Sequence, residues 1–338
     1  MSFLPEPLRM LVTNPRIGDM SSDGPLAYAL RQKLTGNINL PKDLSLINKT
    51  ILITGATSGV GLSSSRQLLH LGANLIIGAR SLQRAKTLRA DLLKSTPNGK
   101  VSIYELDMES LDSVDSFISH ISADNDIRFD LVLLNAGIYS TKKTPADSQD
   151  ATPHLLQVNF RATAYLALRL LPFIINKPEG RLVLVTSEAH AWATYTPPPG
   201  DSTKLLSSLP RTITAEEEYY TAKLFLALFG RELASRLENP TTILTTPGFC
   251  ASGFFREGES ALTKIIYATS ARSCEQGAKL HLHALTCPDI KSGTYLRDGK
   301  EANLSKFAES DEGKLVQKRL WDEIVELVQN RGWNVEMN

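Results

Sequence analysis

Six short runs rich in Val, Ile and Leu recur along the chain from residue 48, and segments of helical length separate them. The runs are TILITGA (50–56), NLIIGAR (74–80), VSIYELD (101–107), LVLLNAG (131–137), RLVLVTS (181–187) and TTILTTPG (241–248). Continuous apolar runs of this length are typical of strands buried on both faces of a parallel sheet. Their alternation with helices predicts an α/β fold built on a doubly wound parallel sheet.

The helices expected between these strands begin near Leu62, Leu82, Leu111, Thr152 and Glu216. We expect a single domain over residues 48–338, preceded by a proline-punctuated N-terminal extension over residues 1–47. Ligands of such sheets bind beyond the C-terminal ends of the strands. Polar residues at those ends are therefore the first candidates for function.

Composition excludes several classes of function. The formal net charge of +1 argues against a nucleic-acid binder. The three cysteines, Cys250, Cys274 and Cys287, have neither metal-site nor disulfide-framework spacing, and we expect no metal. No signal segment and no apolar window long enough for a stable membrane span is evident. We therefore expect a cytoplasmic protein.

The segment TGATSGVG (54–61) follows the first strand and opens a helix. Its three glycines allow a tight turn and a close approach of the backbone to a ligand. The free N–H groups and the positive end of the helix favour a pyrophosphate, so a dinucleotide site is expected. The alternative is a glycine-rich turn without a ligand. The residues expected to contact the cofactor here are Gly55, Thr57, Ser58, Gly59, Val60 and Gly61.

The second run ends at Arg80, where many dinucleotide sites have an acid that binds the ribose 2′-OH. The planar fork of an arginine can instead pair with a 2′-phosphate, which favours NADP(H) over NAD(H). A surface arginine stacked on adenine is the alternative. The third run ends at Asp107, next to Met108, and this carboxylate could accept from the adenine amino group or cap the strand.

The segment EEEYYTAK (216–223) raises the question of which tyrosine performs chemistry. Thr214 begins a capping-box pattern, so a helix is expected from about Ala215. Tyr219 and Lys223 are then four residues apart and share a face. A nearby ammonium lowers the pKa of a phenol, and such a tyrosine can exchange a proton with an alcohol or carbonyl oxygen. Tyr220 is three residues from the same lysine, so spacing alone leaves both tyrosines open.

Small or polar residues end three more of the apolar runs, where they could face a cofactor or substrate. They are Asn135, Ala136 and Gly137, then Ser187, then Pro247 and Gly248. Asn159 lies among apolar residues of a helix expected over Thr152–Leu171, where its amide must find partners. The glutamates of 216–218 are assigned to the helix start, where negative charge is favourable.

In this order, TGATSGVG, NAG (135–137), VN (158–159), the Ser187 strand end, YYTAK (219–223) and PG (247–248) resemble the short-chain dehydrogenase/reductase family over roughly residues 48–335. The resemblance implies a Rossmann fold and a nicotinamide-dependent oxidoreductase acting on CH–OH groups. The family's Tyr-x-x-x-Lys motif corresponds to Tyr219 and Lys223, not to Tyr220.

Roles for individual residues follow from the same resemblance. Tyr219 would be the proton donor or acceptor, and Lys223 would hold the nicotinamide ribose and lower the tyrosine pKa. Ser187 would position the substrate oxygen, and Asn159 would anchor a water of a proton relay. On the cofactor, Asn135 would line the adenine ribose side and Ser252 would contact the carboxamide.

The segments IIGAR (76–80), TSEAH (186–190) and EQGAK…SGTYLRDGKEA (275–302) resemble the retinol-dehydrogenase-like subgroup, which prefers NADP(H). Members act on retinoids, sterols and other bulky apolar alcohols or ketones, and related sequences reduce polyketide or terpenoid intermediates of secondary metabolism. We therefore expect an NADP(H)-dependent oxidoreductase with a small-molecule substrate. The alternative is a catalytically idle NADP(H)-binding sensor or scaffold.

The separation of Ser187 from Tyr219 is longer than is usual in the family, which predicts an inserted substrate loop over 189–214. Aromatic residues of this loop and of the segment after the sixth strand could form an apolar pocket or pack ordinarily under loops. They are Trp192, Tyr195, Phe249, Phe254 and Phe255. An apolar stripe on the last helix serves either the core or a homodimer interface; it comprises Leu315, Leu320, Ile324 and Val328.

Overall fold

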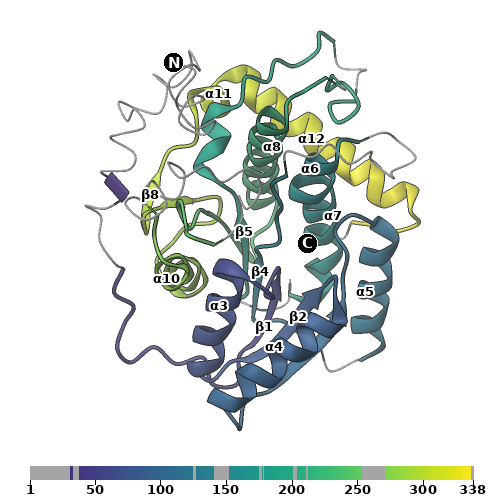
Figure 1. The fold of residues 1–338 in the computed structure, drawn as a ribbon. Helices are drawn as coiled ribbons and strands as arrows, with labels where there is room; N and C mark the ends of the chain where they lie inside the picture. Colours follow the sequence, from purple (N-terminus) through teal and green to yellow (C-terminus); the bar gives the residue numbers. More distant parts are fainter. Residues whose placement is uncertain are drawn as a thin grey trace.

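The computed structural model in Figure 1 describes residues 31–32, 38–124, 127–140, 152–174, 177, 179–200, 204–210, 212–252 and 271–335. Phe254 and Phe255, most of the N-terminal extension and part of the inserted loop lie outside these residues. Within the described residues, eight strands form one sheet in the order β3-β2-β1-β4-β5-β6-β7-β8. All neighbouring strands are parallel except β7 and β8, which confirms the doubly wound α/β fold.

The strands are β1 (Thr50–Thr54), β2 (Asn74–Ala79), β3 (Val101–Glu105), β4 (Leu131–Leu134), β5 (Arg181–Val185), β6 (Thr241–Thr245), β7 (Tyr295–Arg297) and β8 (Lys300–Ala302). The longer helices are α3 (Gly59–His70), α4 (Leu82–Ser95), α5 (Leu111–Ala123), α7 (Ala162–Leu170), α8 (Ala215–Arg236), α10 (Cys274–Thr286) and α12 (Asp311–Asn330). Short helical segments are α6 (His154–Leu156), η2 (Gln157–Arg161), η3 (Leu171–Phe173), η4 (Glu188–Trp192) and α11 (Lys306–Glu309).

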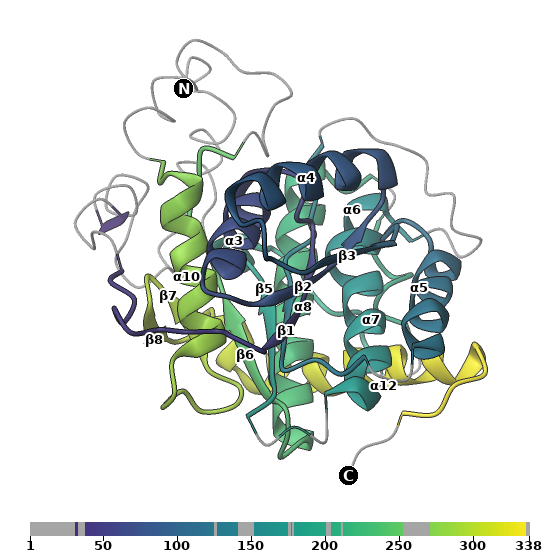
Figure 2. The ribbon, with the colours of Figure 1, turned by 90° about the horizontal axis from the view of Figure 1, so that it is seen from below.

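Two hydrophobic cores lie on the two faces of the sheet. Along β1, Leu52 belongs to the core under α5, α7, α8 and α12, whereas Ile51 and Ile53 belong to the core under α3, α4 and α10. Successive side chains of a strand point to opposite faces, so each apolar run supplies both cores. Figure 2 shows α3, α4 and α10 on one side of the sheet and α5 and α7 on the other.

The last helix, α12, packs across α8 and α7, where Trp321 stacks on Phe229 with ring centroids 5.7 Å apart. The expected apolar stripe serves this packing: Leu320, Ile324 and Val328 are at most 1% exposed, whereas Leu315 is 49% exposed. The stripe is therefore used within the chain. A homodimer stays a prediction.

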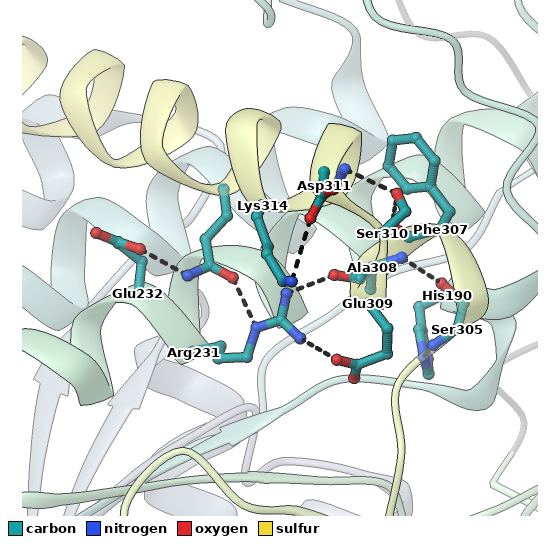
Figure 3. Close-up of polar contacts among 12 residues, drawn as sticks. His190, Arg231, Glu232, Ser305, Phe307, Ala308, Glu309, Ser310, Asp311 and Lys314 are labelled. Atoms are coloured by element: carbon teal, nitrogen blue, oxygen red, sulfur yellow. Dashed lines mark hydrogen bonds and ion pairs between the residues drawn. The ribbon is translucent and has the colours of Figure 1, made fainter.

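Polar contacts attach the α11–α12 segment to α8, as Figure 3 shows. Arg231 donates to the Gln317 side-chain oxygen at 2.6 Å, to the Ala308 carbonyl at 2.5 Å and to the Glu309 carboxylate at 3.1 Å. Gln317 in turn donates to Glu232 at 2.6 Å. The helix that begins at the predicted catalytic residues is therefore fastened at its far end to the C-terminal part of the chain.

Three elements differ from the sequence-based expectation. The first helix begins at Gly59 rather than near Leu62, because the glycine turn itself supplies its first residues. The helix expected over Thr152–Leu171 contains a π-helical turn, Gln157–Arg161, around Asn159. The hairpin of β7 and β8 was not predicted because its strands are only three residues long; its signal is the Asp298–Gly299 turn, where both φ angles are positive.

Candidate active site

The predicted cofactor turn adopts backbone geometry that depends on glycine. Gly55 and Gly59 have φ angles of +67° and +55°, where L-residues are strained. At Gly61, a side-chain Cβ would overlap the carbonyl oxygen of Gly55. Ser58 is the N-cap of α3 and is exposed, and its side chain makes no cap hydrogen bond. The first turn of α3 thus presents its N–H groups to a ligand, and the cradle fits a pyrophosphate.

The segment after β4 lies against this turn and is hydrogen-bonded to it. The Thr54 hydroxyl accepts from the backbone N–H groups of Asn135 and Ala136 at 3.1 and 3.0 Å. The Asn135 amide donates to the carbonyl oxygens of Thr54 at 3.0 Å and Gly55 at 3.3 Å. The Asn135 side chain therefore holds the turn in shape, in addition to any contact with a ribose.

Gly137 lies between the cofactor turn and two candidate catalytic residues. A Cβ at this position would be 2.9 Å from Asn159 Oδ1 and 3.6 Å from Lys223 Nζ. Asn159 is fully buried, and its amide bonds both backbone groups of Ile138: Oδ1 accepts from N at 2.9 Å and Nδ2 donates to O at 2.9 Å. The π-helical turn around Asn159 directs this amide toward the strand end.

Tyr219 and Ser187 meet at the end of β5. Their side chains form a hydrogen bond, which works against the dominant effect of burial, and burial raises the pKa of Tyr219 to about 12. Lys223 Nζ donates to the Val185 carbonyl at 2.9 Å and lies 5.8 Å from the centre of the Tyr219 ring. Burial lowers the pKa of Lys223 to about 8.

The direction of the Tyr219 pKa differs from the sequence-based expectation of a phenol whose pKa is lowered by the ammonium. Both side chains are almost completely buried, and desolvation of the charged form is the largest cause of both pKa shifts. At neutral pH, Tyr219 therefore carries its proton. This protonation state suits a proton donor.

Tyr220 points to a different environment, although it is adjacent in sequence. Its ring packs edge to face against Trp192, with centroids 5.4 Å apart, and burial raises the pKa of its hydroxyl. Ser187 influences the pKa of Tyr219 and not that of Tyr220. The structure thus separates the two tyrosines, which spacing alone could not do.

The predicted adenosine side of the site lies at the ends of β2 and β3. The Arg80 side chain is 62% exposed and forms an ion pair with Glu109. Asp107 Oδ1 accepts from the Glu109 backbone N–H at 3.0 Å, and Met108 is buried. Arg80 is therefore held beside Glu109 at the ends of β2 and β3 and remains accessible to an anionic ligand.

The turn after β6 contains the remaining cofactor candidates. Gly248 has a φ angle of +74°, and a Cβ there would lie 2.6 Å from Gln32 Oε1. Gln32 bonds both backbone groups of Phe249, at 2.8 and 2.9 Å. Ser252 lies against Gly59, because a Cβ on that glycine would be 3.0 Å from the Cβ of Ser252. The Pro247–Gly248 turn is thus held by a residue of the N-terminal extension.

Sequence analysis missed a buried charged cluster behind Ser187. Glu188 is 4% exposed and pairs with Arg31 at 2.5 Å, while Asp298 pairs with Arg31 and, at 2.5 Å, with Arg272. Burial raises the pKa of Glu188, and Arg31 is the first of the arginines that work against this shift. Arg31 and Glu188 are 157 positions apart in the sequence, and no local pattern indicates their contact.

The described part of the inserted loop divides between two environments. Tyr195 is buried against Phe225, with ring centroids 4.8 Å apart, and contributes to the core. Trp192 belongs instead to the cluster around Tyr219, together with Tyr139 and Tyr220. Of the residues expected to form an apolar pocket, Trp192 therefore lies beside the candidate catalytic tyrosine.

The chain is similar to known proteins in sequence and in fold. Residues 49–197 match the family described as short chain dehydrogenase. The short chain dehydrogenase resG of Aspergillus sclerotiorum is 49% identical and covers 98% of both chains. The short chain dehydrogenase rstn4 of Aspergillus nomiae is 48% identical, over 98% of this chain and 94% of the relative.

Solved structures share the fold at lower identity. A protein of Mycobacterium paratuberculosis superposes with a TM-score of 0.65 at 23% identity, covering 87% of this chain and 98% of its own. The alcohol dehydrogenase of Thermococcus sibiricus, complexed with 5-hydroxy-NADP, superposes with a TM-score of 0.56 at 20% identity, covering 75% and 99%. At these identities the likeness concerns the fold alone.

Proposed function

This chain belongs to the short chain dehydrogenase family of oxidoreductases, and from that premise we propose that it is an NADP(H)-dependent enzyme that interconverts a ketone or aldehyde with an alcohol. Its substrate is proposed to be a bulky apolar small molecule of the polyketide, terpenoid, sterol or retinoid kind. The observation that carries the proposal is the hydrogen bond of Ser187 with Tyr219, beside Lys223 and the glycine cradle.

Residues of the glycine cradle and Lys223 would hold a nicotinamide cofactor, which would supply or take the hydride when bound. The Tyr219 hydroxyl gives its proton to the substrate oxygen during reduction, and the Ser187 hydroxyl donates a hydrogen bond to the same oxygen. Positioning and stabilisation of the developing alkoxide lower the barrier. The phenol of Tyr219 is protonated at neutral pH, as a proton donor must be, because its pKa is raised to about 12.

Lys223 and Asn159 are proposed to assist Tyr219 by holding the cofactor and by relaying protons. Lys223 remains largely charged at neutral pH, because its lowered pKa is still about 8. The ammonium is proposed to hold the nicotinamide ribose. Asn159 reaches the same glycine as Lys223, which suits it to anchor a water that carries protons from the lysine to solvent.

The preference for NADP(H) rests on Arg80. Its exposed guanidinium can pair with a 2′-phosphate, whereas an acid at this position would repel it. Fluorescence titration of NADPH and NADH against the wild type and Arg80→Ala tests this. We expect the variant to bind NADPH about tenfold more weakly and NADH unchanged. Arg89→Ala, an exposed change on α4, is the control, and equal affinity of the wild type for both cofactors would refute the assignment.

The apolar character of the substrate is supported by the side chains around Tyr219. Leu155, Ala189 and Tyr219 form a small buried cluster, against which aromatic and aliphatic side chains pack. These are Ile138, Tyr139, Trp192, Ala215 and Tyr220. Mostly apolar walls with a few polar anchors are typical of small-molecule sites.

The experiment that tests the function compares Tyr219→Phe with Tyr220→Phe in a screen of bulky ketones and alcohols with NADPH or NADP⁺. Loss of the acid–base group should reduce kcat at least about 100-fold in Tyr219→Phe. Tyr220→Phe should retain turnover, because its hydroxyl does not meet Ser187. Turnover that survives Tyr219→Phe unchanged contradicts the mechanism.

The second candidate is a catalytically idle NADP(H)-binding sensor or scaffold. It would bind the cofactor with the same cradle and show no turnover with any substrate of the screen. The presence of Ser187, Tyr219 and Lys223 in mutual reach favours the enzyme, because a sensor has no need of a paired phenol and hydroxyl.

A further inference from the structure

The three consecutive glutamates before Tyr219 bond three different segments of the chain. Successive residues of an α-helix are rotated by about 100°, so three in a row reach a wide arc around the helix. Sequence analysis assigned Glu216, Glu217 and Glu218 only to the favourable electrostatics of a helix start. Their contacts indicate a more specific role.

Glu218 caps the segment that carries Asn159. It is 8% exposed, and its Oε1 accepts from the backbone N–H groups of Leu155 at 2.5 Å and Leu156 at 3.1 Å. The N-cap of that helix is Pro153, which makes no side-chain cap hydrogen bond. The Glu218 carboxylate from α8 therefore supplies the helix cap that Pro153 does not provide. Hydrogen bonds to a charged acceptor are strong.

Glu217 holds the loop after η4. Its Oε1 accepts from the Thr194 backbone N–H at 2.6 Å and from the Thr221 hydroxyl at 3.2 Å. Thr194 follows Trp192, whose ring packs on Tyr220. The carboxylate thus ties the described start of the inserted loop to the first turn of α8.

Glu216 reaches the segment after β4. Its Oε1 accepts from the Tyr139 hydroxyl at 3.2 Å. The Tyr139 ring lies edge to face against the ring of Tyr219, with centroids 5.7 Å apart. This glutamate therefore fixes an aromatic side chain that touches the proposed proton donor.

We propose that Glu216, Glu217 and Glu218 are positioning residues that attach three walls of the substrate site to the first turn of the helix carrying Tyr219. The inference rests on the proposed function, because the three segments are walls only if a substrate binds beside Tyr219. Glu218 sets the place of Asn159, whereas Glu216 and Glu217 set the aromatic walls formed by Tyr139 and Trp192. The same turn therefore carries the proton donor and defines the space in which a substrate meets it.

The kinetic test separates the three glutamates by their effects on kcat and KM. Glu218→Ala should lower kcat about tenfold, because misplacement of a supporting group by a fraction of an ångström has effects of this size. Glu217→Ala and Tyr139→Phe should instead raise KM for a bulky ketone about tenfold and leave KM for a small ketone within about twofold. Glu218→Gln and Glu217→Gln retain an oxygen acceptor and should recover most of the loss.

Glu232→Ala is the matched control. Glu232 lies on the same helix, about 21 Å from Glu218 at 1.5 Å per residue, and bonds Gln317 and Arg236. This change should lower the melting temperature and leave kcat and both KM values unchanged. If Glu232→Ala reproduces the kinetic pattern of Glu218→Ala, the glutamates act only through stability and the proposal is overturned.

Amide hydrogen exchange gives a readout that does not depend on activity. Glu218→Ala should speed exchange at Leu155 and Leu156, and Glu217→Ala at Thr194, each about tenfold and without change in α8 itself. Unchanged exchange at these amides overturns the proposal. If exchange changes as expected but no Tyr219-dependent turnover is found, the proposed function fails while the attachment of the three segments stands.

Discussion

On the β1–β4 side of the site, hydrogen bonds join the glycine turn of 54–61 to Asn135 and Ala136. The short side chains of Thr54 and Asn135 make these bonds. On the β5–β7 side, charged or amide side chains make the shaping contacts, and they join residues as far apart as Arg31 and Asp298. The first arrangement needs small residues in a fixed order. The second arrangement needs partners that only the folded chain brings together. Its residues can therefore change without any change in the glycine motif of 54–61.

The largest expected effect is on the first side, where one methyl group breaks the arrangement. In Gly61→Ala, the new Cβ meets the Gly55 carbonyl oxygen, which belongs to the backbone and cannot rotate away. We expect NADPH affinity to fall roughly 100-fold, as displacements of about 1 Å in a preorganised site do. Isothermal titration calorimetry measures this. Gly200→Ala, where φ is +83° but a Cβ meets nothing within 4 Å, is the control for backbone strain without a clash, and near-normal affinity of Gly61→Ala would contradict the comparison.

A second effect, on stability rather than on affinity, is expected from the charged cluster of the second side. In Arg31→Met, the buried Glu188 carboxylate loses its first compensating charge, and the free energy of unfolding should fall by about 2–4 kcal/mol. Urea denaturation measures it. Because the loss comes from an uncompensated charge, the double variant Arg31→Met/Glu188→Gln should recover more than half. A double variant that is less stable than the single one would refute the charge argument.

The attachment of α12 to α8 gives a matched pair of variants for the same side. Arg231→Met removes three hydrogen bonds around Gln317 and should cost about 1–3 kcal/mol. Lys204→Met removes an exposed ion pair with Glu326 and should cost less than about 0.5 kcal/mol. Thermal unfolding compares them, and equal losses would show that burial does not govern these contacts.

The last prediction concerns pH. Lys223 is charged below its pKa of about 8 and neutral above it, so proposed support of the cofactor ribose weakens as pH rises. The kcat/KM of ketone reduction should fall to about half its pH 6 value at pH 8 and to about a tenth at pH 9. Lys223→Arg, which remains charged throughout, should flatten this profile at a lower absolute rate. A wild-type profile that is flat from pH 6 to 9.5 speaks against this role for Lys223.

The fold and the proposed residues of the first side could be predicted because they depend on local pattern. Alternating apolar runs and helices determine the parallel sheet, and the glycines of 54–61 reveal the cradle by their spacing. Tyr219 and Lys223 were recognisable for the same reason, since four residues on a helix bring them to one face.

The remaining features could not be predicted, because each depends on the tertiary structure. The pKa of Tyr219 rises through burial, which spacing to Lys223 does not reveal. The pair of Arg31 and Glu188 links segments that no periodicity connects. The roles of Glu216–Glu218 depend on the N–H and O–H groups that they bond, and the sequence does not reveal where those groups lie. The sequence alone suggested only a solvated helix start.

The π-helical turn at Gln157–Arg161 has a consequence for the register of the whole helical segment. It places one extra residue in a turn, and each residue of an α-helix advances the rotation by about 100°. If the same residues formed an ordinary α-helix instead, the segment before them would be rotated relative to α7 by about that amount. Leu155 would then turn away from Glu218 while α7 stayed in the core. The π-helical turn thus sets the rotation between Leu155, which faces Glu218, and α7, which faces the core.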